Sequence, residues 1–249
     1  MAYEDPEDFD FNRRLINHRQ DTNGELYTQL SPVPIEDLTE AQSYALRTAV
    51  MVWLDHNAGN RPVYVKTHCA NVTVDHIPMI PPSLTESALY IVRDPRDVAV
   101  SLADHHGTSI DEAIVRLATS NYGLIKHGGY QHVGSWSQNV SSWNREFSYS
   151  RFVLRYEDLR EDPEHWFRAV LEFFGFIYDE ARFRDALGLT SLEALRAQEA
   201  AKGFNTKSPH QKVFFREGKV GGLALSDAQA AQIVADHGKV MGELGYAIY

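Results

Sequence analysis

The stretch YIVRDPRDVAVS, residues 90–101, joins an apolar strand to a charged turn and an amphipathic helix. Pro95 suits the first turn of that helix, so Arg93 stands at the carboxyl end of a strand predicted over 88–92. Ser101 follows about two turns into the helix. A planar guanidinium and a hydroxyl at these places suit a bound phosphate, although an ordinary strand-to-helix corner has the same residues. In that plainer interpretation the other charges are two helix-start acids and a solvent-exposed arginine: Asp94, Asp97 and Arg96.

Three further segments also place charge next to apolar strands or glycines. VYVKTH (63–68) is a strand ending in Lys and His, RFVLRYEDL (151–159) contains a third strand, and FFREGKVGG (214–222) is a basic loop. Helical patterns occupy much of the rest: 38–55, 95–105, 109–121, 135–146, 163–174, 179–187, 191–202 and 226–244. Strands separated by helices predict an α/β fold with a mainly parallel sheet and a ligand site at the carboxyl ends of its strands.

Two segments are expected to lack regular structure. Residues 123–134 are a glycine-rich stretch that suggests a bend, and residues 1–23 are polar and expected to be partly mobile. Trp136 and Trp143 share one face of a predicted helix, which favours a place in the core.

In this order and spacing the segments resemble the bacterial cytosolic type of sulfotransferase, which uses 3′-phosphoadenosine-5′-phosphosulfate (PAPS). VRDPRDVAVS looks like the family's 3′-phosphate motif and VKTH like its catalytic strand end. RYEDLREDP is similar to its central strand, and FFREGKVGG to its late phosphate loop. The resemblance covers residues 30–245 and implies a P-loop-nucleotide-kinase-like sulfotransferase fold, with a single domain over 1–249.

The resemblance also implies the residues of the site. His68 takes the place of the catalytic base, and Lys66 projects to the same side if the strand runs straight to its end. Four residues would contact the 3′-phosphate: Arg93, Ser101, Arg216 and Gly218. Tyr156 and Thr190 would lie near the adenine, with core packing or helix capping as their alternative roles.

Two departures from the family's pattern stand out. Glu217 replaces a Lys in the late loop, and Gly222 and Leu223 replace an Asp-Trp pair, which should weaken anion binding there. The family also begins with a strand and a Lys-bearing loop that holds the 5′-phosphosulfate, and no segment matches this loop. We therefore expect the first strand–helix (βα) unit to be missing and the chain as given to be nearly inactive, either as a shortened version of a longer enzyme or as a degenerate relative that binds nucleotide poorly.

Composition limits the partners. The formal net charge of −10 argues against nucleic acid or an anionic membrane as the main partner. No apolar run approaches the roughly 18 residues of a membrane span, and the acidic first residues do not form a secretory signal. With Cys69 as the single cysteine, no internal disulfide is possible. The sequence predicts a cytoplasmic protein without a metal site.

The predicted function is transfer of a sulfuryl group from PAPS to a hydroxyl or amine of a small acceptor. The alternative is a degenerate, non-catalytic relative that acts as a nucleotide-binding or assembly partner. A small-molecule kinase is disfavoured, because no G-x-x-x-x-G-K-[ST] loop is present. The acceptor and the oligomeric state stay open.

Overall fold

The computed structural model describes residues 10, 19–22, 24–59, 62–126, 129–216 and 225–248. These residues group into two compact units, each built from stretches that are far apart in the sequence. Besides Asp10, unit 1 contains the described residues within 89–114 and 152–233. Unit 2 contains those within 18–88, 115–151 and 234–249. Whether the two units act as the single domain expected over 1–249 stays a prediction.

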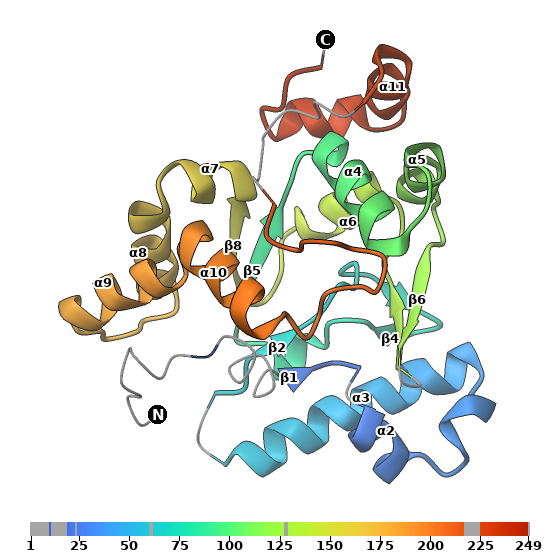
Figure 1. Ribbon diagram of the computed structural model, residues 1–249. Coiled ribbons are helices and arrows are strands. Elements are labelled where there is room, and N and C mark those ends of the chain that lie inside the picture. Colours follow the sequence, from blue (N-terminus) through green and yellow to red (C-terminus); the bar gives the residue numbers. More distant parts are fainter. Residues whose placement is uncertain are drawn as a thin grey trace. The chain divides into compact units, whose positions relative to one another are not determined.

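Unit 2 begins with a strand, a helix and a parallel pairing. Strand β1 (Arg19–Gln20) is followed by helix α2 (Gly24–Leu30), and β1 pairs in parallel with β2 (Val65–Lys66), as Figure 1 shows. A strand–helix unit thus precedes the VKTH strand, which corrects the expectation that this unit is missing. A strand of 2 residues and a helix of 7 are too short to produce a periodic pattern that sequence analysis can detect.

One hydrophobic cluster of the core of unit 2 lies between α2 and α3 (Glu40–Ala58). The buried residues of this cluster are Leu26, Tyr27, Leu46, Val50 and Leu54. Helix α3 starts at a capping box, in which Thr39 and Gln42 bond each other's backbone N–H groups. It ends at Gly59, whose φ of 61° favours glycine.

The glycine-rich stretch is a hairpin rather than a bend. Strands β6 (Gly123–Lys126) and β7 (Gly129–His132) pair antiparallel. A Cβ at Gly123 would collide with the Tyr130 side chain, and one at Gly129 would lie 2.9 Å from Thr22. Gly123 therefore serves close packing within the hairpin and Gly129 close packing against Thr22, and the interpretation as a bend was wrong.

The other elements of unit 2 are short. They are a 3₁₀ turn (Ile35–Asp37), β3 (Thr73–Val74), β4 (Ile77–Pro78), a second 3₁₀ turn (Pro82–Leu84) and α6 (Trp136–Trp143). Strands β3 and β4 pair antiparallel. Trp136 and Trp143 are buried, which confirms their place in the core.

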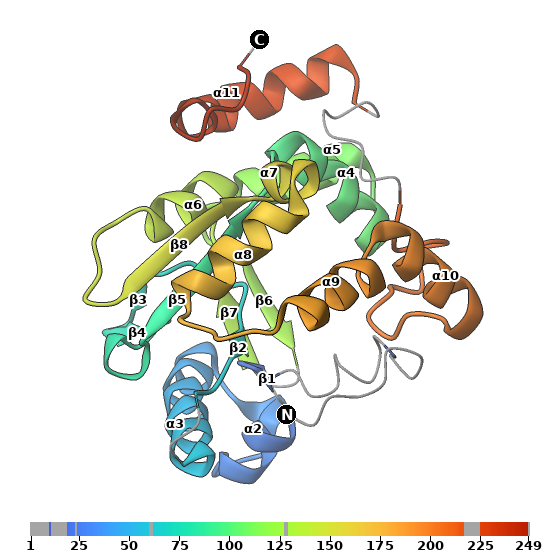
Figure 2. The ribbon, with the colours of Figure 1, turned by 90° about the vertical axis from the view of Figure 1, so that its left-hand side faces the viewer.

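Unit 1 surrounds the neighbouring strands β5 (Ser87–Val92) and β8 (Ser150–Arg155), whose first two residues each are counted in unit 2. The helices of this part of the chain are α4 (Pro95–His106), α5 (Ile110–Ala118), α7 (Tyr156–Glu161), α8 (Pro163–Phe173), α9 (Glu180–Leu189), α10 (Leu192–Lys202) and α11 (Asp227–Glu243). Helices α5 and α11 begin in unit 1 and end in unit 2. Helix α8 lies against β8 (Figure 2), where the Phe152 ring contacts Trp166 and Phe173. The predicted α/β fold of strands flanked by helices is confirmed.

Two other sequence expectations change. The strand predicted over 63–68 is limited to Val65–Lys66, so the alternation argument that placed Lys66 and His68 on one side does not extend to His68. Within the stretch expected to be partly mobile, residues 19–22 form β1 and a turn, while 1–9, 11–18 and 23 lie outside the described residues.

Candidate functional site

The corner between β5 and α4 is fixed by charged groups. The Asp94 carboxylate caps α4 by accepting the Arg96 N–H at 2.9 Å, and the same carboxylate pairs with the Arg96 guanidinium at 2.6 Å. The Asp94 N–H donates to buried Glu157 on α7 at 2.9 Å. Arg96 is thus held by an ion pair, not left in solvent as the plainer interpretation had it.

Arg93 leaves this corner beside an acid and an aromatic ring. Its guanidinium lies 3.3 Å from the Asp97 carboxylate and 4.7 Å from the centre of the Tyr156 ring. The Arg93 side chain keeps 26% of its surface exposed, whereas Asp97 keeps 4%. Stacking on Tyr156 orients the guanidinium, and its exposed part can still accept an anion.

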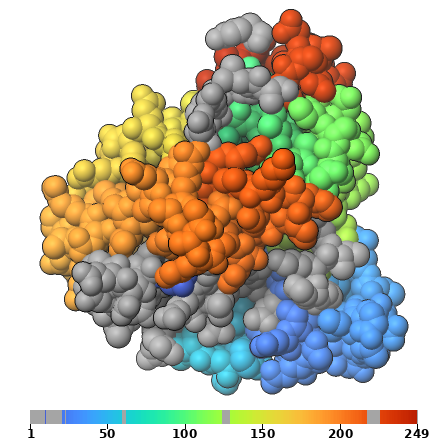
Figure 3. Space-filling model, viewed as in Figure 1, coloured from blue at the N-terminus to red at the C-terminus, as the bar shows by residue number. Residues whose placement is uncertain are grey.

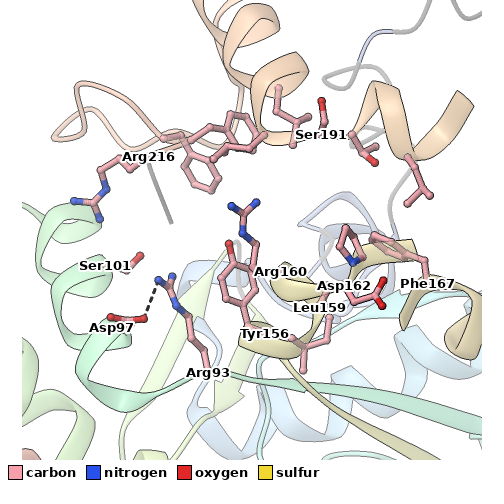
Figure 4. Close-up of a pocket in the computed structure, with 18 of the residues that line it drawn as sticks. Arg93, Asp97, Ser101, Tyr156, Leu159, Arg160, Asp162, Phe167, Ser191 and Arg216 are labelled. Carbon is pink, nitrogen blue, oxygen red and sulfur yellow. Dashed lines mark hydrogen bonds and ion pairs between the residues drawn. The ribbon is translucent and has the colours of Figure 1, made fainter. Parts of the chain in front are cut away.

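A cavity of about 1200 Å³ opens in front of Arg93, entirely within unit 1. Figure 4 shows Arg93, Ser101 and Arg216 along one side of it, with Tyr156 below. Apolar side chains from several helices and the late loop line the remainder, including Leu159, Phe167, Leu187, Leu192 and Phe214. Such a cavity suits a flat apolar ring system that carries anionic groups.

The late loop contributes Arg216, which lies 3.6 Å from Asp104 on α4. The Arg216 side chain is 44% exposed and the Asp104 side chain 31%, so water reaches both groups. Gly218 and the glycines after it lie outside the described residues.

Tyr156 and Thr190 both line the cavity. Tyr156 begins α7 directly after β8. Thr190 ends α9, and its hydroxyl donates to the Ala186 carbonyl at 2.7 Å. Thr190 therefore caps its own helix, which matches the alternative role considered for it.

Lys66 and His68 belong to unit 2, where both are exposed. The His68 carbonyl accepts from the Asn139 side chain at 3.3 Å, and the Lys66 carbonyl accepts the Asp21 N–H at 3.3 Å. The structure thus brings Arg93, Ser101, Tyr156, Thr190 and Arg216 to one cavity of unit 1. That the Lys66 and His68 side chains face this cavity stays a prediction.

A buried polar cluster lies next to the VKTH strand in unit 2. Arg47 forms an ion pair with Asp21 and donates to the Met79 carbonyl at 3.1 Å and the Thr67 hydroxyl at 3.3 Å. Burial raises the pKa of the nearby Cys69 thiol, an effect that Arg47 opposes. The Cys69 thiol is therefore kept neutral.

Sequence reasoning missed Arg160, which also lines the cavity. Its side chain points into the cavity in Figure 4. The signal was present: Arg160 follows Tyr156 by four residues, so an α-helix beginning at Tyr156 places both on one face. The sequence analysis predicted no helix there.

The fold and the cavity define an α/β protein with a cavity at a strand end that is lined by Arg93, Arg160 and Arg216. The sulfotransferase domain family matches residues 23–243, so the chain belongs to the sulfotransferase family.

Two curated relatives give the scale of the similarity. Cytosolic sulfotransferase 13 of Arabidopsis thaliana is 29% identical over 161 residues, which cover 59% of this chain and 50% of that protein. Sulfotransferase 1C2 of Homo sapiens is 28% identical over 140 residues, which cover 54% and 45%. The chain thus spans about half the length of these relatives.

Solved structures show the same fold. Mouse sulfotransferase SULT7A1 complexed with PAP has a TM-score of 0.53 and 16% identity, over 76% of this chain and 73% of that one. Retinol dehydratase in a complex with retinol and PAP has a TM-score of 0.55 and 19% identity, over 86% and 64%. At these identities the likeness concerns the fold alone. Within the described ranges, no helix is both long and apolar enough to cross a membrane.

Proposed function

We propose that the protein transfers a sulfuryl group from PAPS to a hydroxyl or amine of a small acceptor. The convergence of Arg93, Ser101 and Arg216 on one cavity carries this proposal. Two guanidinium groups and a hydroxyl suit the dianionic 3′-phosphate of the donor. The PAP complexes of the structural neighbours support the same ligand.

The roles of the cavity residues follow from their contacts. Arg93 and Arg216 each face a carboxylate that a phosphate can displace, because both guanidinium groups are partly exposed. Tyr156 and Thr190 lie where the adenine would enter, with the Tyr156 ring kept in place by Arg93. The apolar side chains of the cavity would cover the purine ring.

The chemical step would use Lys66 and His68. An acceptor oxygen forms a bond to sulfur while the bond from sulfur to the 5′-phosphate oxygen breaks, and the acceptor proton passes to the His68 ring nitrogen. Lys66 would stabilise the negative charge that builds on the leaving phosphate oxygen. The product PAP carries that charge away, so the transfer step balances in atoms and charge without a metal or a redox partner.

The test is turnover of PAPS with a generic phenol, followed as PAP release. His68→Ala should lower kcat by about 10²- to 10⁴-fold, the usual contribution of general acid–base catalysis, and leave PAP affinity within about twofold. His56→Ala, on an exposed position of α3, is the matched control and should turn over at the wild-type rate. Binding of PAP without turnover in the wild type would instead favour the non-catalytic relative.

The composition of the loop between β1 and α2 leads us to expect slow turnover by this chain. In the order of the fold it stands where the family carries its phosphosulfate loop, yet residues 21–25, which run into the first turn of α2, read Asp-Thr-Asn-Gly-Glu and contain no cation. A loosely held sulfonate loses rate steeply, roughly a hundredfold for a misplacement of about 1 Å. Grafting a Lys-bearing loop onto residues 22–25 should then raise kcat. Fast turnover without the graft would show that another segment holds the phosphosulfate.

The acceptor class and the location belong to the same proposal. Solved neighbours carry retinol and androsterone, which are small alcohols, so a small apolar alcohol is the first acceptor to try. The names of the Arabidopsis relatives support a cytoplasmic location. The sequence motifs suggest the bacterial subtype of the family. Identifying the organism from which the gene comes tests this proposal.

A further inference from the structure

The late loop that carries Arg216 is held by a buried carboxylate on α10. Glu199 is 9% exposed, and its two oxygens accept the backbone N–H groups of Phe214 at 2.8 Å and Phe215 at 3.0 Å. Lys207 lies 3.4 Å from the same carboxylate. Burial acts to raise the pKa of Glu199, but the two N–H groups and Lys207 together lower it. Glu199 is therefore a charged clamp on the two residues before Arg216.

A second residue of α10 completes the clamp. Arg196 donates from Nε to the Phe215 carbonyl at 2.8 Å, so α10 bonds both the N–H and the C=O of this residue. The Phe204 ring packs against the Phe214 and Phe215 rings at 4.5 and 4.8 Å between centroids. Figure 3 shows the segment after α10, coloured orange-red, on the surface of the molecule. An exposed segment is thus fixed at one point, directly before Arg216.

The other side of the segment is tied to α4. Gln211 is 7% exposed, donates to the Asp104 carboxylate at 2.8 Å and lies 3.2 Å from the His105 ring nitrogen. Asp104 is also the acid nearest to Arg216. The position of Arg216 relative to Arg93 therefore depends on one anchor in α10 and one in α4.

We infer that Glu199 is a positioning residue that sets the affinity of Arg216 for the 3′-phosphate. The inference rests on the proposed function and extends it, because Glu199 touches no ligand and acts through the backbone of residues 214 and 215. A freely moving Arg216 would lose side-chain and backbone entropy on binding the phosphate, whereas the bonds to Phe214 and Phe215 remove part of the backbone entropy before the phosphate binds.

The variant Glu199→Gln isolates this effect. Glutamine keeps the size of the side chain but offers one oxygen, so its amide N–H₂ group would face the second backbone N–H. The ligand pair PAP and adenosine 5′-phosphate then separates positioning from folding, because only PAP carries the 3′-phosphate. Glu193→Gln, an exposed position on the same helix, is the matched control.

Titration calorimetry with both ligands tests whether Glu199 positions Arg216. Glu199→Gln should weaken PAP binding about three- to tenfold, the scale of one hydrogen bond, and leave adenosine 5′-phosphate binding within about twofold. In an Arg216→Ala background the same substitution should have no further effect on PAP. Equal losses for both ligands, or no loss for PAP, would overturn the inference, as would a full additional loss in the Arg216→Ala background.

Failure of the proposed function has a different signature. A wild-type chain that binds neither ligand, or binds both equally, refutes the 3′-phosphate site itself and the inference with it. If the wild type clearly prefers PAP and the Arg216→Ala variant binds PAP with unchanged affinity, only the inference is overturned. If Glu199→Gln does not fold, as judged by its thermal unfolding, Arg196→Ala loosens the same segment by releasing the Phe215 carbonyl, and the same measurements are made on it.

Discussion

Arg47 of unit 2 and Arg93 of unit 1 each face a carboxylate, but the two pairs differ in access to water. Arg47 and Asp21 are 1% and 0% exposed, and further bonds to Met79, Thr67 and Gln131 enclose the pair. Arg93 keeps 26% of its surface exposed beside Asp97. An anionic ligand can therefore reach Arg93, while Arg47 is closed to any partner beyond those it already has.

This difference separates an ion pair that builds the fold from one suited to binding. Removing one member of an enclosed pair leaves a charge that neither water nor protein compensates. The Arg93 pair is open on one side only, because Arg93 carries the accessible surface while the Asp97 carboxylate is 4% exposed.

The largest effect is expected for Arg47→Met. The substitution leaves the Asp21 carboxylate buried without its cation, so the free energy of unfolding should fall by about 3–5 kcal/mol. Urea unfolding followed by circular dichroism measures it. The double variant Arg47→Met with Asp21→Leu should recover part of the loss, because it removes both charges. A loss below about 1 kcal/mol in the single variant would show that the enclosed pair does not stabilise unit 2.

The second effect is on binding. Arg93→Ala should weaken PAP binding by about 1.5–3 kcal/mol, the range of a hydrogen bond to a charged group. Calorimetry on the wild type and the variant measures it. Arg145→Ala, an exposed arginine of unit 2, is the matched control and should bind PAP like the wild type. Unchanged PAP affinity in Arg93→Ala would contradict the assignment of Arg93.

The contrast also explains what the sequence could and could not predict. Arg93 and Ser101 were predictable, because an apolar run, a proline and an amphipathic helix fix local structure around them. Arg47 was not predictable as part of an ion pair: its partner Asp21 lies 26 positions away and meets it only through tertiary packing. The same holds for Glu199, which meets Phe214 and Phe215 from a neighbouring helix.

The length of each helix or strand explains most of the other differences between the predicted and the observed elements. Helices α4, α8, α9, α10 and α11 were predicted within about two residues, because each has an apolar stripe and a capping residue. Strand β1 and helix α2 are too short for a periodic pattern. Gly123 and Gly129 looked like breakers, since their role in close packing depends on Tyr130 and Thr22, which the local sequence does not reveal.

A third, smaller effect is expected at Arg160. Among the described residues it has no ion pair or hydrogen bond, so an anion would displace no carboxylate from it. Arg160→Ala should weaken PAP binding by about 0.5–1.5 kcal/mol, and the loss should shrink as salt screens the charge. Titrations at two salt concentrations measure both. A loss that does not change with salt would mean that the Arg160 side chain acts by packing rather than by charge.

The smallest effect concerns the closed interior of unit 2 and depends on pH. His237 on α11 is 3% exposed and lies 2.8 Å from the Ser137 hydroxyl, against the Trp136 ring. Burial lowers its pKa below 6.5, although the neighbouring Asp236 carboxylate acts in the other direction. The folded state therefore holds the neutral ring at pH values where the unfolded chain already binds a proton.

The sign of the pH dependence follows from this difference. Well above the unfolded-state pKa of about 6.5, His237 is neutral in both the folded and the unfolded state, so burial of the neutral ring makes its full contribution to the free energy of unfolding. As the pH falls through about 6.5 the unfolded state gains a proton first, so the free energy of unfolding decreases until the pH reaches the folded pKa. Between pH 7.5 and 5.5 we expect the free energy of unfolding to decrease by less than about 1 kcal/mol, since proton uptake by one group over one pH unit changes it by about 1.4 kcal/mol at most.

Urea unfolding of the wild type and of His237→Asn across this pH range tests the expectation, with His56→Asn as the matched control. The slope should flatten in His237→Asn alone; an unchanged slope there would assign the pH dependence to another group.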